Sequence, residues 1–404
     1  MAGSMPPVTV ADVEAAADLL GDVVRCTPLE PSRVLSAVVG GEVQLKCENL
    51  QRAGSFKIRG AYARMARLGP AERARGVVAA SAGNHAQGVA LAAQLLGVSA
   101  RVFMPAGTAL PKIQATRGYG AQVTFAGHTV DEAIAAAEEY AAAEGAVLIH
   151  PFDHHEVIAG QGTVGLEILR QCPRVRTVLV ATGGGGLLAG IATVLAGEGR
   201  RVIGVQAEGA AAYPRCLAAG RPIRLETMAT MADGIAVGRP GDLPFEIIQR
   251  LGAEVVTVSE ELISRALLLL FERAKLVVEP AGAVSVAALL GARAHLEPPV
   301  VAVLSGGNID PLLMMRVIGH GMAAAGRYLE LRLRLPDRPG SLAAFLAVLA
   351  ATDANVLEIQ HVRAAVGTAI GEAEVVVRLE TQGPHHREQV FAGLVSAGYA
   401  PQAS

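Results

Sequence analysis

One lysine in this 404-residue chain stands where covalent chemistry is possible. Lys57 lies between an aromatic ring, Phe56, and a positive charge, Arg59, at a point where a helix can begin. A lysine amine can hold an aldehyde cofactor as a Schiff base and can later carry a proton. The same residues would also suit the solvated first turn of an amphipathic helix. The segment 55–60 therefore becomes informative only together with three further motifs.

A second motif follows the short apolar run 76–80, which is typical of a buried parallel strand. An alanine- and leucine-rich helix comes next and should end near Gly97. The motif thus lies on a strand-to-helix turn, where free backbone N–H groups can bind a carboxylate or a phosphate. Asn84 adds a side-chain donor. The motif comprises residues 81–88 and begins with Ser81, Ala82, Gly83, Asn84 and His85.

A third motif is a run of four glycines between the expected strand 177–180 and a helix that begins near Leu187. Without side chains, this backbone can close around a small anion at a helix N-terminus. The run is not a Walker loop, because no Gly-Lys-Ser/Thr follows it. It also lacks the acidic ribose partner of a dinucleotide site. A plain flexible loop is the alternative. The glycines are Gly183, Gly184, Gly185 and Gly186.

The fourth motif, which contains Ser305 and Asn308, follows the apolar run 300–304. A hydroxyl therefore emerges at the C-terminal end of a strand, where open α/β sheets bind their ligands. Either polar side chain could instead serve only as a helix cap. Four such loops at strand ends predict a single shared cleft.

In combination and in this order, the four motifs resemble the fold-type II pyridoxal 5'-phosphate enzymes. The resemblance is greatest to the threonine ammonia-lyases, also called threonine dehydratases, with serine racemases as near relatives. It extends over roughly residues 8–322. It implies a tryptophan synthase β-like α/β fold, with pyridoxal 5'-phosphate as the cofactor.

The resemblance also implies roles for the cofactor residues. Lys57 matches the Schiff-base lysine, and Phe56 matches the ring that packs against the pyridine. Asn84 matches the partner of the cofactor's phenolic oxygen, and Ser305 matches the partner of its pyridine nitrogen. The residues that match the phosphate loop are Gly183, Gly184, Gly185, Gly186 and Leu187.

Two further assignments concern the substrate. Residues Ser81, Ala82, Gly83, Asn84 and His85 match the loop that holds the substrate carboxylate. Glu279 precedes a predicted helix and matches a residue near the ring or the substrate amine. A carboxylate merely favoured at a helix N-terminus is the alternative for Glu279.

The implied reaction is a β-elimination, in which an α-proton is removed and a β-hydroxyl is expelled. A free lysine, with a pKa of about 10.4, becomes a useful base only after desolvation or loss of its proton. A serine at the ring nitrogen, rather than an aspartate, leaves the ring largely neutral and favours prompt loss of the hydroxyl.

Two departures from relatives restrict this assignment. Serine racemases carry a second serine where this chain has Ala82, so efficient racemisation is not expected. The racemase-like branch also binds a divalent cation through acidic residues. The matching positions here are Gln206 and Ala212, so no divalent metal is expected.

Alternating strands and helices between about residues 42 and 322 predict a doubly wound α/β core. The resemblance divides it into a large cofactor-binding lobe, residues 1–52 and 146–323, and an inserted small lobe, residues 53–145. Closure of the small lobe over the substrate would exclude water.

The tail, residues 327–404, has a different pattern. Strand-like alternation at 328–335 is followed by helix, strand, strand and helix, an order that resembles an ACT domain. Asp337, Gly340 and Asn355 match the ligand loop of such domains. Regulation by an amino acid, first of all isoleucine, is expected. A purely structural tail is the alternative.

Composition excludes several other classes of protein. A net charge of −2 without a basic stripe, and only 3% aromatic residues, argue against a nucleic-acid partner. The longest apolar runs fall short of the roughly 20 residues that span a bilayer, and no signal segment is evident. We therefore expect a cytoplasmic protein without a membrane partner. Symmetric pairing of the tails would make it a homodimer or homotetramer.

Three functions are compatible with the sequence. The first is L-threonine ammonia-lyase, producing 2-oxobutanoate and ammonia, with L-serine giving pyruvate as a secondary activity. The second is a related enzyme, such as a serine or hydroxyaspartate dehydratase or a threonine synthase. The third is a catalytically silent amino-acid sensor, against which intact Lys57, Asn84 and Ser305 argue.

Overall fold

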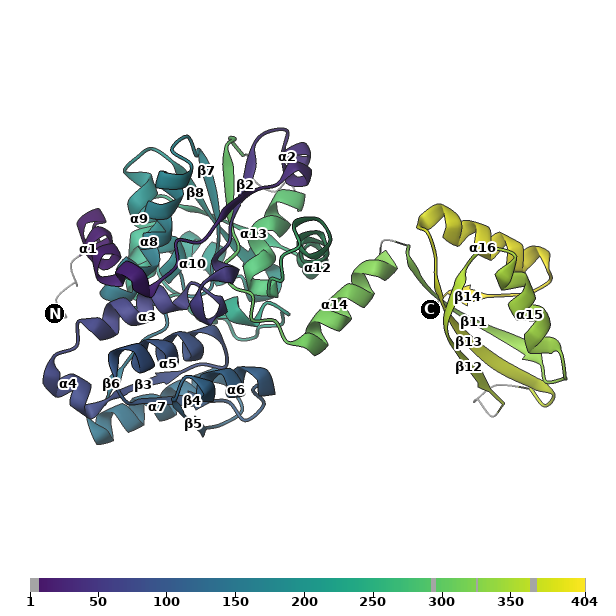
Figure 1. The fold of residues 1–404 in the computed structure, drawn as a ribbon, viewed down its shortest axis with the longest axis horizontal. Coiled ribbons are helices and arrows are strands. Elements are labelled where there is room, and N and C mark those ends of the chain that lie inside the picture. The colour runs from purple at the N-terminus through teal and green to yellow at the C-terminus, as the bar shows by residue number, and fades with distance from the viewer. Residues whose placement is uncertain (1–6, 292–295, 325, 364–368, 404) are drawn as a thin grey trace. The chain divides into compact units, whose positions relative to one another are not determined.

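The structure is a computed structural model that describes residues 7–291, 296–324, 326–363 and 369–403. Contacts divide the chain into two compact units, Met1–Pro311 and Leu312–Ser404 (Figure 1). The predicted large lobe extends to residue 323, whereas the boundary between the two units lies at Pro311.

The larger sheet of the first unit has six strands in the order β1-β2-β10-β7-β8-β9. All neighbours are parallel except β1 and β2, which are antiparallel. The central strands β10 and β7 are buried along their whole length, as expected for parallel strands covered on both faces. The strand bounds are β1 Leu29–Pro31, β2 Val43–Lys46, β7 Thr177–Ala181, β8 Arg201–Ala207, β9 Glu254–Val258 and β10 Val300–Val303.

Helices cover both faces of this sheet. Figure 1 shows α8 and α9 on one side of β7 and β8, with α12 and α13 on the other side. This arrangement places the main apolar core between the sheet and the α8–α9 layer. The helix bounds are α1 Val10–Leu20, α2 Arg33–Val39, α8 His155–Gln171, α9 Gly186–Ala196, α10 Ala212–Ala219, α11 Asp242–Arg250, α12 Glu260–Leu269 and α13 Pro280–Gly291.

A second, smaller sheet is inserted in the sequence between β2 and β7. Its four parallel strands follow the order β5-β4-β3-β6. The predicted strand before the second motif is confirmed as β3, and the helix after it ends at Gly97 in the left-handed conformation. The bounds are α3 Lys57–Ala66, α4 Pro70–Arg75, β3 Val77–Ala80, α5 Asn84–Leu96, β4 Ala100–Met104, α6 Leu110–Gly118, β5 Gln122–Phe125, α7 Val130–Glu144 and β6 Val147–Leu148.

Glycines let α8 lie close to two neighbouring helices. A Cβ atom added to Gly160 would come within 2.6 Å of the Arg59 carbonyl oxygen on α3. A Cβ added to Gly190 on α9 would come within 2.6 Å of the Gly162 nitrogen. Helix α8 therefore joins α3, which begins at Lys57, to α9, which begins within the glycine run.

The second unit has the predicted β-α-β-β-α order, preceded by α14 and followed by a short last strand, β14. Its antiparallel sheet has the strand order β12-β13-β11-β14. The predicted half-buried strand is confirmed, because alternate leucines of β11 are buried. The bounds are α14 Pro311–Ala324, β11 Tyr328–Pro336, α15 Ser341–Ala350, β12 Asn355–Val362, β13 Glu372–Glu380, α16 Pro384–Ser396 and β14 Gln402–Ala403.

The edge strand β12 is exposed along its whole length, including Leu357 and Ile359. Among the helices that the structure describes, none has both the length and the apolar character needed to cross a bilayer.

Candidate active site

Lys57 is the first residue of α3, and its amine is turned into the protein. The Nζ atom donates a 2.9 Å hydrogen bond to the Pro151 carbonyl and lies 5.2 Å from the centre of the Phe56 ring. The Phe56 backbone N–H donates to the Ser305 carbonyl at 3.2 Å, which joins the first motif to the fourth. Burial lowers the pKa of Lys57 to about 8, against the opposing effect of the Glu279 carboxylate.

Glu279 connects the second and the fourth motifs. Asn84 Nδ2 donates to Glu279 Oε1 at 2.5 Å, and Asn308 Nδ2 donates to Asn84 Oδ1 at 2.9 Å. A Cβ on Gly306 would lie only 2.2 Å from Glu279 Oε1. The carboxylate can therefore occupy this position only because residue 306 has no side chain. The structure therefore brings Asn84, Glu279 and the loop after β10 together, as the sequence motifs predict.

Burial and, after it, the nearby Asp233 charge raise the pKa of Glu279 to about 7. The amide of Asn84 and the positive charges of Lys112 and Lys57 oppose this rise. Because this pKa lies close to neutrality, Glu279 can gain or lose a proton under ordinary conditions.

Ser305 follows β10 and is almost completely buried. Its Oγ atom lies 3.4 Å from the Ala281 carbonyl in the first turn of α13, which is a long hydrogen bond. A shorter bond to another acceptor or donor is therefore open to this hydroxyl.

The loop after β3 is held by its own side chains. Ser81 Oγ accepts a 3.0 Å hydrogen bond from the Gly83 N–H. His85 Nε2 donates to the Ile149 carbonyl at 2.7 Å, and burial together with the Lys57 charge lowers the pKa of His85 to about 3. A neutral, buried His85 serves to hold this loop rather than to transfer protons.

Lys112 was not identified from the sequence. It lies on α6, and its Nζ would be 3.6 Å from a Cβ placed on Gly83 in the loop after β3. Lys112 also forms a 2.5 Å ion pair with Asp233, a residue from the part of the chain that follows β8. Its position in the sequence could have indicated it, because Lys112 follows the strand β4. The segments that follow parallel strands lie together at one edge of a sheet.

The glycine run lies at the N-terminus of α9, and its surroundings leave no room for side chains. A Cβ on Gly184 would lie 2.4 Å from the Phe152 ring, and one on Gly185 would lie 1.9 Å from the Tyr213 hydroxyl. Gly185 also has a φ of +99°, which favours glycine. The first N–H groups of α9 have no partner inside the helix.

Comparison with known proteins decides the family. The profile described as "Pyridoxal-phosphate dependent enzyme" matches residues 20–306 of the chain.

The chain belongs to this family of pyridoxal-phosphate dependent enzymes.

This enzyme is 47% identical over 394 residues to an L-threonine ammonia-lyase of Thermotoga maritima. The alignment covers 97% of this chain and 98% of the relative. The enzyme is 46% identical over 398 residues to the L-threonine ammonia-lyase of Geobacter sulfurreducens, covering 98% of each. Among solved structures, maize serine racemase has a TM-score of 0.74 and 31% identity, covering 79% of this chain and 99% of its own. A threonine deaminase of T.th. has a TM-score of 0.71 and 43% identity, covering 75% of this chain and 99% of its own.

The fold of the enzyme is accordingly the α/β fold of fold-type II, with one mixed and one parallel sheet in the first unit. The residues present fit pyridoxal phosphate. A helix N-terminus without side chains suits its phosphate, and the buried amine of Lys57 suits its aldehyde. The hydroxyl of Ser305 suits its ring nitrogen.

Gln206, which matches a metal-ligand position of the racemase-like branch, forms a hydrogen bond to the backbone in this structure. Gln206 Oε1 accepts a 2.8 Å hydrogen bond from the Tyr213 N–H, and the Tyr213 hydroxyl donates to the Gly184 carbonyl at 3.3 Å. This amide and phenol thereby support the glycine run. Across the ranges that the structure describes, no cluster of three or more His, Cys, Asp or Glu could hold a metal ion.

The three residues predicted to bind an effector do not meet within one copy of the chain. Asp337 pairs with Arg363 at 3.0 Å, whereas Asn355 Nδ2 donates to Glu380 at 3.4 Å. The nine-residue strand β11 separates these two places, a distance of about 30 Å. Gly340 begins α15 with a φ of +90°.

Proposed function

We propose that this enzyme is an L-threonine ammonia-lyase that converts L-threonine to 2-oxobutanoate and ammonia, with L-serine giving pyruvate as a secondary reaction. The main support is the amine of Lys57, which is buried and has a lowered pKa. The chain that carries it aligns over almost its whole length with two L-threonine ammonia-lyases. The two sides of the reaction balance, because the water lost with the β-hydroxyl is regained in the final hydrolysis.

Lys57 Nζ would hold the cofactor covalently, and the glycine run would hold its phosphate. Phe56, Asn84 and Ser305 would surround its ring. When bound, pyridoxal phosphate supplies an electron-withdrawing ring that spreads the charge left on the substrate's α-carbon.

The protein's own groups then handle the substrate and its protons. The N–H groups at the start of α5, in the segment 81–85, orient the substrate carboxylate. Lys57 Nζ takes the α-proton, and its pKa of about 8 leaves more neutral amine at neutral pH than a free lysine with a pKa of about 10.4. Glu279 exchanges a proton near neutral pH beside this amine. The Lys112–Asp233 ion pair places a positive charge beside Gly83 in the segment 81–85.

Steady-state assay of 2-oxo acid formation from L-threonine and L-serine tests the proposal. We expect turnover of both, with a higher kcat/KM for L-threonine, and no turnover by Lys57→Ala in a folded protein. Borohydride reduction followed by peptide mass analysis should find the cofactor on Lys57. A wild-type protein that binds pyridoxal phosphate but releases no 2-oxo acid from either substrate would contradict the proposal.

We further infer that the second unit is an ACT domain that responds to an amino acid, with isoleucine as the first candidate and valine or serine next. Its strand and helix order supports this inference. Exposed Leu357 and Ile359 on the edge strand β12 support assembly into a homodimer or homotetramer. Adding each amino acid should change the dependence of rate on threonine concentration, and an unchanged curve for all of them would refute regulation.

A further inference from the structure

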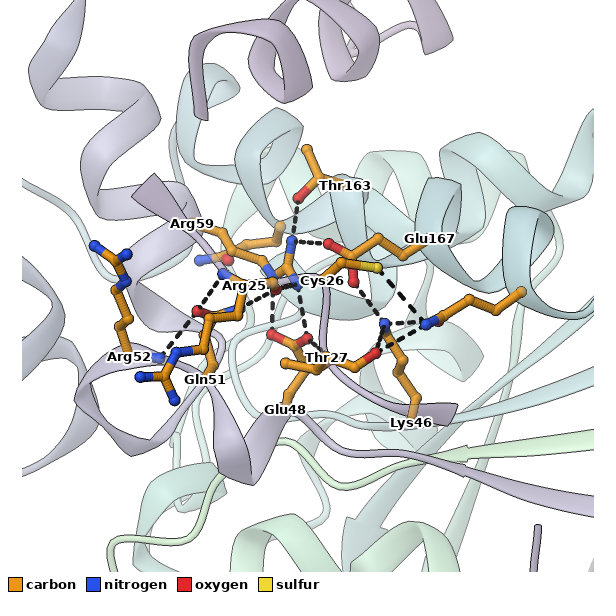
Figure 2. Close-up of polar contacts among 12 residues, drawn as sticks. Arg25, Cys26, Thr27, Lys46, Glu48, Gln51, Arg52, Arg59, Thr163 and Glu167 are labelled. Atoms are coloured by element: carbon orange, nitrogen blue, oxygen red, sulfur yellow. Dashed lines mark hydrogen bonds and ion pairs between the residues drawn. The ribbon is translucent and has the colours of Figure 1, made fainter. Parts of the chain in front are cut away.

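A cluster of four buried charges lies beside the helix that carries Lys57. Lys46, Glu48 and Arg59 are completely buried, and Glu167 is only 7% exposed (Figure 2). Two positive and two negative charges give this buried charge cluster no net charge. None of the steps of binding, orientation or proton transfer proposed above uses these residues.

Arg59 is the centre of this cluster, because each of its five N–H groups has an acceptor. Its Nε and Nη2 atoms donate to the two carboxylate oxygens of Glu48, both at 2.8 Å. Its Nη1 atom donates to Glu167 Oε1 at 2.7 Å and to Thr163 Oγ1 at 3.1 Å. The fifth bond, from Nη2, reaches the Arg25 carbonyl at 3.3 Å. A lysine cannot reproduce this planar fork.

Lys46 occupies the other end of the cluster. Its Nζ donates to Glu167 Oε2 at 2.5 Å, to Gln171 Oε1 at 2.8 Å and to the Thr27 carbonyl at 2.8 Å. Lys46 thus shares the Glu167 carboxylate with Arg59. Its bonds connect β2 to α8 and to the segment before β1, and none of them reaches α3.

Arg59 lies two residues after Lys57 on α3. Successive residues of an α-helix turn by about 100°, so these two side chains leave the helix about 200° apart. Lys57 therefore points toward Pro151 and Glu279 while Arg59 points to the opposite side, into the cluster. Any rotation of α3 about its axis would move both side chains together.

The contact between α3 and α8 is close. A Cβ on Gly160 would lie 2.6 Å from the Arg59 carbonyl oxygen, and the Gln161 side chain lies against Gly60. In addition to the bonds of Arg59, the Gly60 N–H donates to Gln161 Oε1 at 3.2 Å and Arg64 Nη1 donates to Glu156 Oε2 at 2.9 Å. Of the two arginines of α3 that bond to α8, Arg59 lies nearer to Lys57 in the sequence.

We infer that Arg59, held by Glu48 and Glu167, is a positioning residue that sets the rotation of α3 and so aims the Lys57 amine at the cofactor aldehyde. This inference depends on the proposed role of Lys57. Apolar residues of similar volume commonly replace buried ion pairs without loss of stability, so folding alone gives no reason for five directed bonds.

The test compares Arg59→Lys and the milder Thr163→Val with Lys46→Met, which changes the same cluster without removing a bond to Arg59. The first measurement is the dissociation constant of pyridoxal phosphate for each apo-protein. The second is the rate at which a small amine reagent labels Lys57 in the apo-protein, followed by peptide mass analysis. Denaturant unfolding provides the stability of each variant.

We expect the dissociation constant to rise at least tenfold in Arg59→Lys and about threefold in Thr163→Val, but less than twofold in Lys46→Met. The labelling rate of Lys57 should change in the first two variants alone. In the loaded enzymes, kcat should fall more than KM changes. These effects should appear even where Lys46→Met is the least stable of the three.

Two results would overturn the inference: values for Arg59→Lys and Thr163→Val within twofold of the wild type, or an equal loss in Lys46→Met. If Arg59→Lys does not fold, Thr163→Val and Lys46→Met still decide the matter. Failure of the proposed function is distinguishable, because wild-type protein that releases no 2-oxo acid can still be tested for cofactor binding and for labelling of Lys57. Absence of the cofactor from Lys57 after borohydride reduction is a separate result. That result would remove both the role of Lys57 and the inference.

Discussion

Asn84 Nδ2 donates a 2.5 Å hydrogen bond to Glu279 Oε1, although the two residues lie 195 positions apart in the sequence. Asn84 begins α5 in the smaller sheet's layer, and Glu279 immediately precedes α13 on the larger sheet. This bond therefore joins the two sheets of the first unit at the candidate site. It also places an amide donor on a carboxylate whose pKa burial has raised to about 7.

Replacing Glu279 should change the titration of Lys57. Burial lowers the pKa of Lys57 to about 8, and the Glu279 carboxylate holds it from falling further. Glu279→Gln removes that negative charge, so the pKa of Lys57 should fall below the wild-type value. Labelling of Lys57 in the apo-protein as a function of pH measures this midpoint. An unchanged midpoint would contradict this prediction and would show that Glu279 is protonated when Lys57 titrates.

His85 should make folding stability depend on pH. Burial lowers its pKa to about 3 in the folded protein, from an ordinary value of about 6.5 when unfolded. As the pH falls below about 6.5, His85 gains a proton in the unfolded chain but stays neutral in the folded protein. The contribution of His85 to the free energy of unfolding is therefore complete above this pH and is lost progressively toward pH 3. In His85→Gln, the free energy of unfolding should change less steeply with pH than in the wild type. The two slopes should differ by up to about 1.4 kcal/mol per pH unit. Denaturant unfolding between pH 4 and 7 provides the comparison, and identical slopes would contradict it.

The Lys112–Asp233 ion pair should affect catalysis more than stability. Because Asp233 is 57% exposed, the pair should contribute no more than about 1 kcal/mol to folding. Lys112→Met should nevertheless raise the KM for L-threonine several-fold, since it removes a cation beside the loop after β3. The matched control is Arg224→Met, which removes the exposed ion pair with Asp131 and should leave KM unchanged. Equal effects of the two variants would show that Lys112 acts only as a surface charge.

Gly184→Ala should weaken binding of pyridoxal phosphate. Its Cβ would lie 2.4 Å from the Phe152 ring, so the glycine run must shift away from its present course. We expect at least a tenfold rise in the cofactor dissociation constant, measured by titration of the apo-protein. Gly197→Ala, at the other end of α9, is the matched control because nothing lies within 4 Å of its added Cβ and its φ is −61°. Wild-type affinity in Gly184→Ala would show that the run can relax without affecting the phosphate.

Removing a partner from the buried charge cluster should destabilise the fold strongly. Glu48→Gln leaves the completely buried Arg59 guanidinium with one carboxylate in place of two. Breaking such a pair typically costs about 3–5 kcal/mol. Equilibrium unfolding in denaturant measures the change, and a loss below about 1 kcal/mol would mean that water or a rearranged side chain compensates Arg59.

The local structure of the motifs was determined by the sequence alone. The apolar run before residues 81–85 forms β3, the glycine run begins α9, and the alternating leucines of the tail form β11. Each of these features depends on residues within a few positions of one another. Periodicity, helix ends and the absence of side chains act at that range.

Only the tertiary structure decided how the charged side chains are used. In the sequence, Arg59 is equally compatible with the solvated turn of a helix. In the fold it is fully buried, because Glu48, 11 residues away, and Glu167, 108 residues away, converge on it. Lys112 likewise meets Asp233 across 121 residues. The environment of a charge depends on which distant elements pack around it, and no local pattern encodes that packing.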